Sequence, residues 1–246
     1  RDRSPSRGLG DVYKRQSMKN RRATTGMFTI PLFIISMMIF ILMAVGVIQD
    51  IPFLKFVDSH SLDWFTTTFG TPQRQFEGDM LNYYMTFCAT IGDVSGVIVM
   101  SVIITIILLF KYPRLAIWFI CTILSGTLIN ILIKMTIERM RPYNHLAIDS
   151  GFSFPSGHSN ASTLFFITLL IVVMPLIKRA VFKSILSGLA LILWISVLIC
   201  RLYFHAHYLT DVVGGVTLGL TWIALWLMVY PLFERIKFKK NKHVIH

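Results

Sequence analysis

The sequence predicts an all-α, polytopic membrane protein: a six-transmembrane-helix bundle with an interfacial amphipathic helix between spans one and two. Of its 246 residues, 54% are hydrophobic and only 15% are charged, whereas a soluble domain has about 25% charged residues. The mean hydropathy is +0.65. Most of the chain consists of apolar stretches of about 20 residues, the length that a helix needs to cross a bilayer. This composition excludes a disordered, a collagen-like or an ordinary soluble protein.

The first seventeen residues, RDRSPSRGLGDVYKRQS, are polar and unlike the rest of the chain. We interpret residues 1–17 as a non-native, adapter-derived segment and residues 18–246 as a single membrane domain. A native basic tail is the alternative. The segment contains five basic and two acidic residues, so the formal charge of +12 becomes +9 for the remaining 229 residues.

The predicted spans follow one another along the remaining chain. They cover residues 27–48, 84–110, 115–133, 158–177, 184–200 and 209–233. Helices are favoured because lipid offers no hydrogen-bond partner for an open sheet edge. Between spans one and two, Phe53, Val57, Leu62 and Phe65 recur at roughly helical spacing among polar residues. This pattern predicts an amphipathic helix in the membrane interface, which either covers the mouth of the bundle or guides a lipid substrate.

The distribution of basic residues predicts a plasma-membrane protein with both termini cytoplasmic. Thirteen basic residues then lie on the inner side: Lys19, Arg21, Arg22, Lys111, Arg114, Lys178, Arg179, Lys183, Arg235, Lys237, Lys239, Lys240 and Lys242. Six lie on the outer side or at outer helix ends: Lys55, Arg74, Lys134, Arg139, Arg141 and Arg201. The net positive charge therefore reflects topology, and we expect no nucleic-acid partner.

Two groups of polar residues fall at the outer end of the bundle, where charge near the membrane core is costly and usually functional. Lys134 and Arg141 are seven residues apart, so two helical turns would place both cations on one side. The segment 155–158, PSGH, directly precedes the fourth apolar run. Free N–H groups at the start of that helix can bind an anion, and Gly157 lets the anion approach closely.

Arg201, His207 and Asp211 form a third group. His207 and Asp211 are four residues apart, so they share a helix face and can hydrogen-bond. A carboxylate on one imidazole nitrogen fixes the tautomer and leaves the other nitrogen free to attack. Each group alone can be structural, but the topology brings all three to one surface. Cations, backbone donors, two histidines and a carboxylate suit phosphoryl transfer.

Taken together, the three groups resemble the signature of the type-2 phosphatidic acid phosphatase family, which belongs to one superfamily with vanadium haloperoxidases. The matching motifs are Lys134-x6-Arg141-Pro142, Pro155-Ser156-Gly157-His158 and Arg201-x5-His207-x3-Asp211. The resemblance covers roughly residues 27–233. The third motif commonly opens with Ser-Arg, whereas Cys200 stands first here. A thiol hydrogen-bonds weakly, so we expect tuning rather than loss of activity.

The resemblance implies that His207 is a nucleophile that forms a phosphohistidine, that Asp211 orients it, and that His158 is the general acid. It also implies which groups bind the phosphoryl oxygens: Lys134, Arg141, Ser156, Gly157 and Arg201. Neither a metal nor another cofactor is expected, because cations and helix-end donors supply the positive charge.

The expected function is an integral-membrane lipid phosphatase that acts on the outer face. Its expected partners are the bilayer and a lipid phosphate: phosphatidic acid, phosphatidylglycerol phosphate or undecaprenyl diphosphate. A lipid phosphotransferase and a non-catalytic headgroup-binding protein are the alternatives, and the oligomeric state stays open.

Three further sets of residues carry expectations of their own. His205 is expected at the surface. Asp93, within span two, either pairs with an active-site cation or joins helices. Gly215 and Gly219 predict that span six packs closely against another helix, either within the chain or in a dimer.

Overall fold

The computed structural model describes residues 5–233, with side chains described from residue 27 onward. This part of the chain is all-helical and has no strand. The helices are α1 (Pro5–Ile48), α2 (Pro52–Phe69), α3 (Met80–Gly92), α4 (Val94–Leu109), α5 (Pro113–Ile137), α6 (Gly157–Thr168), α7 (Ala180–Tyr203) and α8 (Leu209–Phe233). One π-helical turn, Leu169–Val173, and one 3-10 turn, Met174–Leu176, extend α6.

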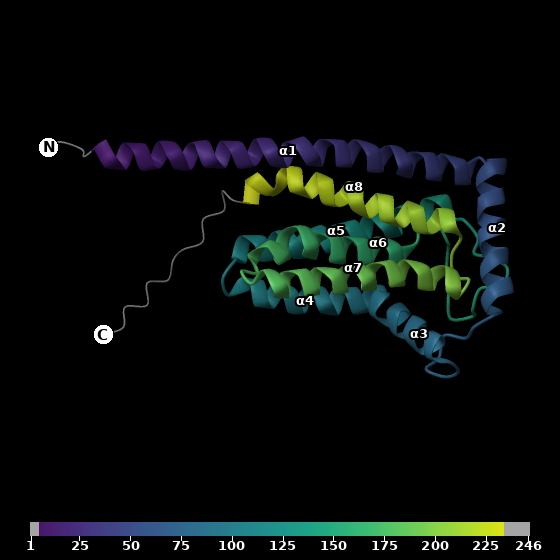
Figure 1. Cartoon of the computed structure of the whole chain (residues 1–246). Helices are drawn as coiled ribbons and strands as arrows, with labels where there is room; N and C mark the ends of the chain where they lie inside the picture. The colour runs from purple at the N-terminus through teal and green to yellow at the C-terminus, as the bar shows by residue number, and fades with distance from the viewer. Residues whose placement is uncertain (1–4, 234–246) are drawn as a thin grey trace.

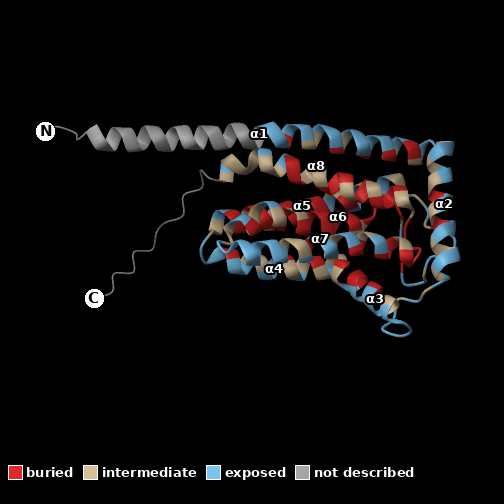
Figure 2. Cartoon of the chain, viewed as in Figure 1, coloured by how far each residue is buried: buried red, intermediate tan, exposed pale blue. Residues whose placement is uncertain are grey.

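Helices α4, α5, α7 and α8 surround α6 in a bundle, and α2 lies across one end of it (Figure 1). Helix α6 is buried along almost its whole length and packs against α4, α5, α7 and α8, whereas α1 lies along α8. Large apolar side chains remain exposed on the outer faces of α1, α4, α5 and α7, as expected for helices that face lipid (Figure 2). Among the described residues, five helices could cross a membrane, or six if α3 and α4 count as one bent span. The predicted fold class is confirmed.

The second predicted span, 84–110, is two helices rather than one. Helices α3 and α4 meet at Asp93 with a bend of 64°. Asp93 has an extended backbone, with φ −54° and ψ 144°, and its N–H still donates to the Ala89 carbonyl at 3.0 Å. A Cβ atom at Gly96 would lie only 2.8 Å from the Thr90 carbonyl oxygen, so the bend requires a glycine there. Hydrophobicity alone does not reveal such a break.

Helix α2 occupies the segment for which an amphipathic helix was predicted. Pro52 starts the helix, where its missing N–H costs nothing. Leu62 is buried against the bundle, while Phe53 and Trp64 are exposed. The inner face also contains a buried carboxylate, Asp58. This side chain ties α2 to the functional site described below.

The Gly215-x3-Gly219 pair brings α8 against α6 within the same chain. A Cβ atom at Gly215 would lie 2.5 Å from the Ser156 carbonyl oxygen, and one at Gly219 would lie 3.0 Å from Cβ of Thr163. Small residues at these positions therefore let the two backbones approach closely. The start of α6 therefore packs directly against the first turns of α8.

The interpretation of residues 1–17 as non-native stays a prediction. Residues 1–4 lie outside the described residues, and no side chain of residues 5–26 is described. The basic residues counted between 235 and 242 also lie outside the described residues.

Candidate active site

The three predicted groups of polar residues meet at the end of the bundle that α2 covers. Lys134 lies in the last turn of α5, and His158 lies in the first turn of α6. Arg201 lies in the last turn of α7, and Asp211 lies in the first turn of α8. Because neighbouring helices alternate in direction, these four ends come together, and the connection between α5 and α6 supplies Arg141.

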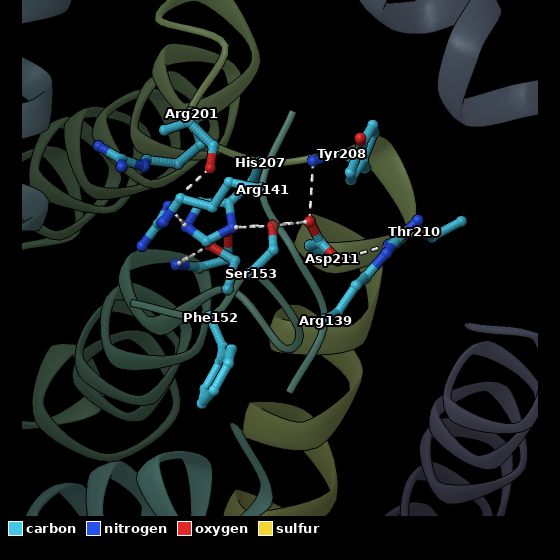
Figure 3. A network of polar contacts seen from close by, with 12 residues as sticks. Arg139, Arg141, Phe152, Ser153, Arg201, His207, Tyr208, Thr210 and Asp211 are labelled. Atoms are coloured by element: carbon cyan, nitrogen blue, oxygen red, sulfur yellow. Dashed lines mark hydrogen bonds and ion pairs between the residues drawn. The ribbon is translucent and has the colours of Figure 1, made fainter. Parts of the chain in front are cut away.

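His207 precedes α8 and is nearly inaccessible, with 2% of its surface exposed. Its Nδ1 atom lies 3.2 Å from Oγ of Ser153 and 3.6 Å from Oδ2 of Asp211 (Figure 3). The Ser153 hydroxyl donates to that same Asp211 oxygen. Ser153 Oγ can therefore accept a hydrogen bond from Nδ1–H, which leaves Nε2 of His207 without a proton. The predicted His207–Asp211 pair is present, but Ser153 bridges it.

Arg141 faces the other side of His207. Its Nη1 atom lies 3.3 Å from Nε2 of His207 and donates to the Ala206 carbonyl at 2.6 Å. The same guanidinium donates from Nε to Gly151 at 3.0 Å and from Nη2 to Ser150 at 2.9 Å. These carbonyl acceptors hold a permanent cation beside the free imidazole nitrogen.

Arg201 is fully buried and only partly paired. Its Nη2 atom donates to Oδ1 of Asp149 at 2.7 Å, while Nε and Nη1 have no hydrogen-bond partner among the described residues. A buried donor without an acceptor is costly, and more so when it is charged. Lys134 lies nearby and donates from Nζ to the Phe152 carbonyl at 3.0 Å. An anion bound here would satisfy the free donors of Arg201.

Ser156 is the N-cap of α6. Its Oγ atom accepts hydrogen bonds from the backbone N–H and the hydroxyl of Ser159, at 3.4 and 2.9 Å. Its own N–H donates to the Asp211 carbonyl at 3.0 Å, which joins the starts of α6 and α8. A Cβ atom at Gly157 would meet nothing closer than Oδ1 of Asn130 at 3.6 Å, so the glycine leaves room over the first turn.

His158 contacts Asp93, which lies at the bend between α3 and α4. Nε2 of His158 lies 2.5 Å from Oδ1 of Asp93. The other carboxylate oxygen of Asp93 accepts a hydrogen bond from Arg74, in the connection between α2 and α3. Asp93 therefore pairs with two groups: His158, the predicted general acid, and the cation Arg74.

Burial and charge set the protonation of the site. Burial lowers the pKa of His207 well below its ordinary value of 6.5, and the nearby Arg201, Lys134 and Arg141 act in the same direction. Burial would raise the pKa of Asp149, but Arg201 outweighs it and holds that pKa below 3.8. The site thus presents a neutral imidazole among cations.

In the described part of the chain, no three His, Cys, Asp or Glu side chains are arranged to hold a metal ion.

Arg139 and Asp58 belong to the site, although sequence reasoning missed them. Arg139 donates from Nη1 to Oδ1 of Asp211 and from Nη2 to Oδ2 of Asp58, both at 2.6 Å. Asp58 also accepts from the backbone N–H and hydroxyl of Thr210, at 2.9 and 2.7 Å. The guanidinium of Arg139 lies over the Tyr208 ring, 4.4 Å from its centroid. Two features of the sequence could have indicated them: Asp58 is a carboxylate within the predicted amphipathic helix, and Arg139 is a second arginine two residues before Arg141.

The expectation that His205 lies at the surface is wrong. Only 1% of the residue is exposed, and its backbone has a left-handed φ of 52°. Its Nε2 atom lies 3.2 Å from Oγ1 of Thr66 on α2, a contact that sequence spacing could not indicate. Cys200 is also buried, and its thiol donates to the Val197 carbonyl within α7.

The fold and this site define a class of protein: an integral-membrane protein with a buried histidine, supported by serine and aspartate, beside arginines that can bind an anion. The chain belongs to the PAP2 superfamily, whose pattern matches residues 114–235. This confirms the family resemblance of the three motifs. The chain is therefore a membrane lipid phosphatase, a phosphoric ester hydrolase.

Relatives support this assignment. The chain is 34% identical over 166 residues to "Phosphatidylglycerophosphatase B" of Bacillus subtilis (strain 168), covering 66% of this chain and 80% of the relative. It is 25% identical over 143 residues to "Lipid phosphate phosphatase epsilon 1, chloroplastic" of Arabidopsis thaliana, covering 58% and 50%. In fold it resembles the crystal structure of a transmembrane PAP2 type phosphatidylglycerolphosphate phosphatase from Bacillus subtilis. The TM-score is 0.63 at 24% identity, with 86% of this chain and 98% of that one covered.

Proposed function

We propose that the enzyme hydrolyses the phosphate monoester of phosphatidylglycerol phosphate through a phosphohistidine at His207. The observation on which this rests is the setting of His207. Its Nδ1 side faces Ser153 and Asp211, while its Nε2 side lies 3.3 Å from the Arg141 guanidinium. This arrangement orients one ring nitrogen for attack and places a cation beside the position that a phosphoryl oxygen would occupy.

In the first step, the lone pair on Nε2 of His207 attacks phosphorus and forms a P–N bond. The P–O bond to the lipid alcohol breaks, and its electron pair stays on the leaving oxygen. His158, as an imidazolium, gives its proton to that oxygen. In the second step, a water oxygen attacks phosphorus and the P–N bond breaks, while the now neutral His158 accepts a proton from the water.

The negative charge of the phosphoryl oxygens is stabilised by cations that surround His207 and by backbone donors. The free Nε and Nη1 donors of Arg201, the guanidinium of Arg141 and the ammonium of Lys134 would bind the phosphoryl oxygens. The first N–H groups of α6, at Gly157 and beyond, add backbone donors and the positive end of the helix dipole. Ser156 caps the helix and so holds this first turn in place.

The substrate proposal follows from the relatives. The Bacillus protein with 34% identity is named for phosphatidylglycerophosphate, and the plant protein is named for lipid phosphates generally. The first name favours phosphatidylglycerol phosphate, and the second is compatible with any lipid phosphate. Phosphatidic acid and undecaprenyl diphosphate are the comparison substrates for any test.

We assign the site to the outer face of the membrane. The connection between α4 and α5 contains Lys111, Arg114 is the second residue of α5, and the start of α7 follows Lys178 and Arg179. These connections lie at the end of the bundle away from α2 (Figure 1). Basic connections favour the cytoplasmic side, which leaves the end with the site outside.

The test measures phosphate released by purified protein in detergent from the three lipids above. We expect the highest kcat/KM for phosphatidylglycerol phosphate. His207→Ala should abolish release, and His158→Ala should lower it about 100-fold or more. The control is His60→Ala, which changes an exposed histidine on α2 and should stay within twofold of wild type. Full activity of the His207 variant would contradict the mechanism, and preference for another lipid would contradict the substrate.

A further inference from the structure

The contact between Asp93 and His158 lies outside the three sequence motifs. Asp93 is at the 64° bend between α3 and α4, and its Oδ1 atom lies 2.5 Å from Nε2 of His158. Its second oxygen accepts from Arg74. The side chains of Asp93 and His158 are 31% and 15% exposed, so the pair lies at the rim of the site, within reach of a substrate.

The two histidines of the site have matching environments. His207 is backed by Asp211, and Asp211 is held by Arg139 from the connection between α5 and α6. His158 is backed by Asp93, and Asp93 is held by Arg74 from the connection between α2 and α3. In both cases a carboxylate lies between an imidazole and a guanidinium. A carboxylate beside an imidazole fixes the ring orientation and favours its protonated form.

A nearby negative charge is needed because cations surround His158. Burial disfavours an imidazolium at His158, and the cations Arg201 and Arg74 act in the same direction. An acid that protonates a leaving oxygen must nevertheless hold its proton until that oxygen develops charge. Asp93 is the carboxylate in contact with the ring. Nε2 has no well-aligned hydrogen bond among the described residues, and such contacts commonly tighten when substrate binds.

We propose that Asp93 is a positioning residue for His158: it orients the imidazole towards the leaving oxygen and stabilises its protonated form. This inference rests on the assignment of His158 as general acid in the proposed function. As the P–O bond breaks, the proton passes from His158 to the leaving oxygen and Asp93 stays ionised. When His158 later accepts a proton from water, Asp93 again stabilises the imidazolium.

The bend between α3 and α4 then has a chemical role. It places the Asp93 carboxylate at a helix break, where the side chain can reach the first turn of α6. Gly96 permits this geometry, because any Cβ there would collide with the end of α3. The polar residue within an otherwise apolar span is thus part of the site.

The experiment compares kcat/KM for two substrates in the same preparation. Dioctanoyl phosphatidylglycerol phosphate has a poor alkoxide leaving group that needs a proton, whereas p-nitrophenyl phosphate releases a stable phenolate that does not. For Asp93→Asn we expect a loss of about 30-fold or more on the lipid, which is part of the roughly 100- to 10,000-fold contribution of general acid catalysis, and less than about threefold on the aryl ester. Because kcat/KM covers the steps up to alcohol release, the later attack of water does not affect it.

Three further variants complete the test. Asp93→Glu, which keeps a carboxylate, should recover part of the activity on the lipid. Asp63→Asn, at an exposed position of α2, should leave both substrates within twofold of wild type. His158→Ala should show the same selective loss as Asp93→Asn, but larger. The ratio of the two activities does not depend on the fraction of folded protein, so partial unfolding cannot imitate the effect.

An equal loss on both substrates, or no loss, would overturn the role of Asp93. If His158→Ala is selective and Asp93→Asn is not, the proposed function stands and this inference fails. If His158→Ala affects both substrates equally, the assignment of the general acid fails. If the wild-type protein releases phosphate from neither substrate, the proposed function itself is wrong.

Discussion

Arg139 donates a hydrogen bond from Nη1 to Oδ1 of Asp211 at 2.6 Å, directly behind the carboxylate that supports His207. Its other terminal nitrogen, Nη2, donates at the same distance to Asp58 of α2. Both carboxylates are buried, and Arg139 is the cation that pairs with both of them. Helix α2 and the first turn of α8 are therefore joined through one side chain.

Replacing Arg139 by alanine should destabilise the protein strongly. Two buried carboxylates would lose their partner, at a cost of about 3–5 kcal/mol. We expect a lower apparent Tm in detergent and a loss of phosphate release that exceeds the loss of folded protein. Thermal unfolding and activity assays on the same sample measure both. Lys55→Ala breaks an exposed pair with Asp50 and should cost less than about 1 kcal/mol. An Arg139 variant as stable as the Lys55 variant would contradict the prediction.

Stability should fall as the pH drops below about 6.5, the ordinary pKa of histidine. Burial holds the pKa of His207 well below that value, so the folded state binds fewer protons than the unfolded state in mild acid. This contribution is complete above pH 6.5 and decreases below it. Burial would raise the pKa of Asp149, but Arg201 holds it below 3.8. Asp149 therefore affects the pH dependence of stability only at lower pH.

The measurement is the apparent Tm between pH 7.5 and 5.5. His207→Gln cannot titrate, so its Tm should decrease less than that of wild type over this range. Burial also lowers the pKa of His205, which should leave a residual slope in the variant. Parallel curves for the two proteins would show that His207 is not the titrating group.

Gly215→Ala should disturb the site through the backbone. The new Cβ would lie 2.5 Å from the Ser156 carbonyl oxygen, so the start of α6 must shift away from α8. Overpacking of this kind costs about 1–3 kcal/mol, and the shift should also lower kcat. The matched control is Gly188→Ala in α7, where a Cβ meets nothing within 4 Å. That change should be neutral or stabilising by about 0.5–1 kcal/mol, since alanine favours a helix. Equal effects of the two changes would exclude the packing argument.

Cysteine labelling of intact cells tests the orientation. Tyr143 lies in the connection between α5 and α6 and is 80% exposed, so a membrane-impermeant maleimide should label Tyr143→Cys from outside. Lys111→Cys, between α4 and α5, should react only after permeabilisation. Cys88 and Cys200 are buried and should give little background. The reverse pattern would place the site on the cytoplasmic side.

The fold and the central residues of the site could be predicted because their signals are local. An apolar stretch of bilayer length predicts a span whatever surrounds it. His207 and Asp211 lie four residues apart, and segment 155–158 stands directly before a span. The motifs then identify the family, and the family match confirms that identification.

The supporting residues could not be predicted because their contacts join distant parts of the chain. Ser153 reaches Asp211 across 58 residues, and Asp58 reaches Thr210 across 152. No spacing rule connects such positions. The break at Asp93 was hidden for a different reason: hydropathy averages over a span and does not register one polar residue beside a glycine.

The position of Asp58 and Asp93 in the chain limits how far the catalytic unit can be moved to another scaffold. A fragment cut to the family match, residues 114–235, would keep both histidines and every motif cation. It would lose Asp58, one of the two carboxylates that pair with Arg139, and Asp93, which contacts His158. A designer who grafts the three motifs onto a new bundle must therefore also supply two acidic side chains from outside the motifs. Conversely, a search for inactive family members can examine these two positions even where every motif residue is intact.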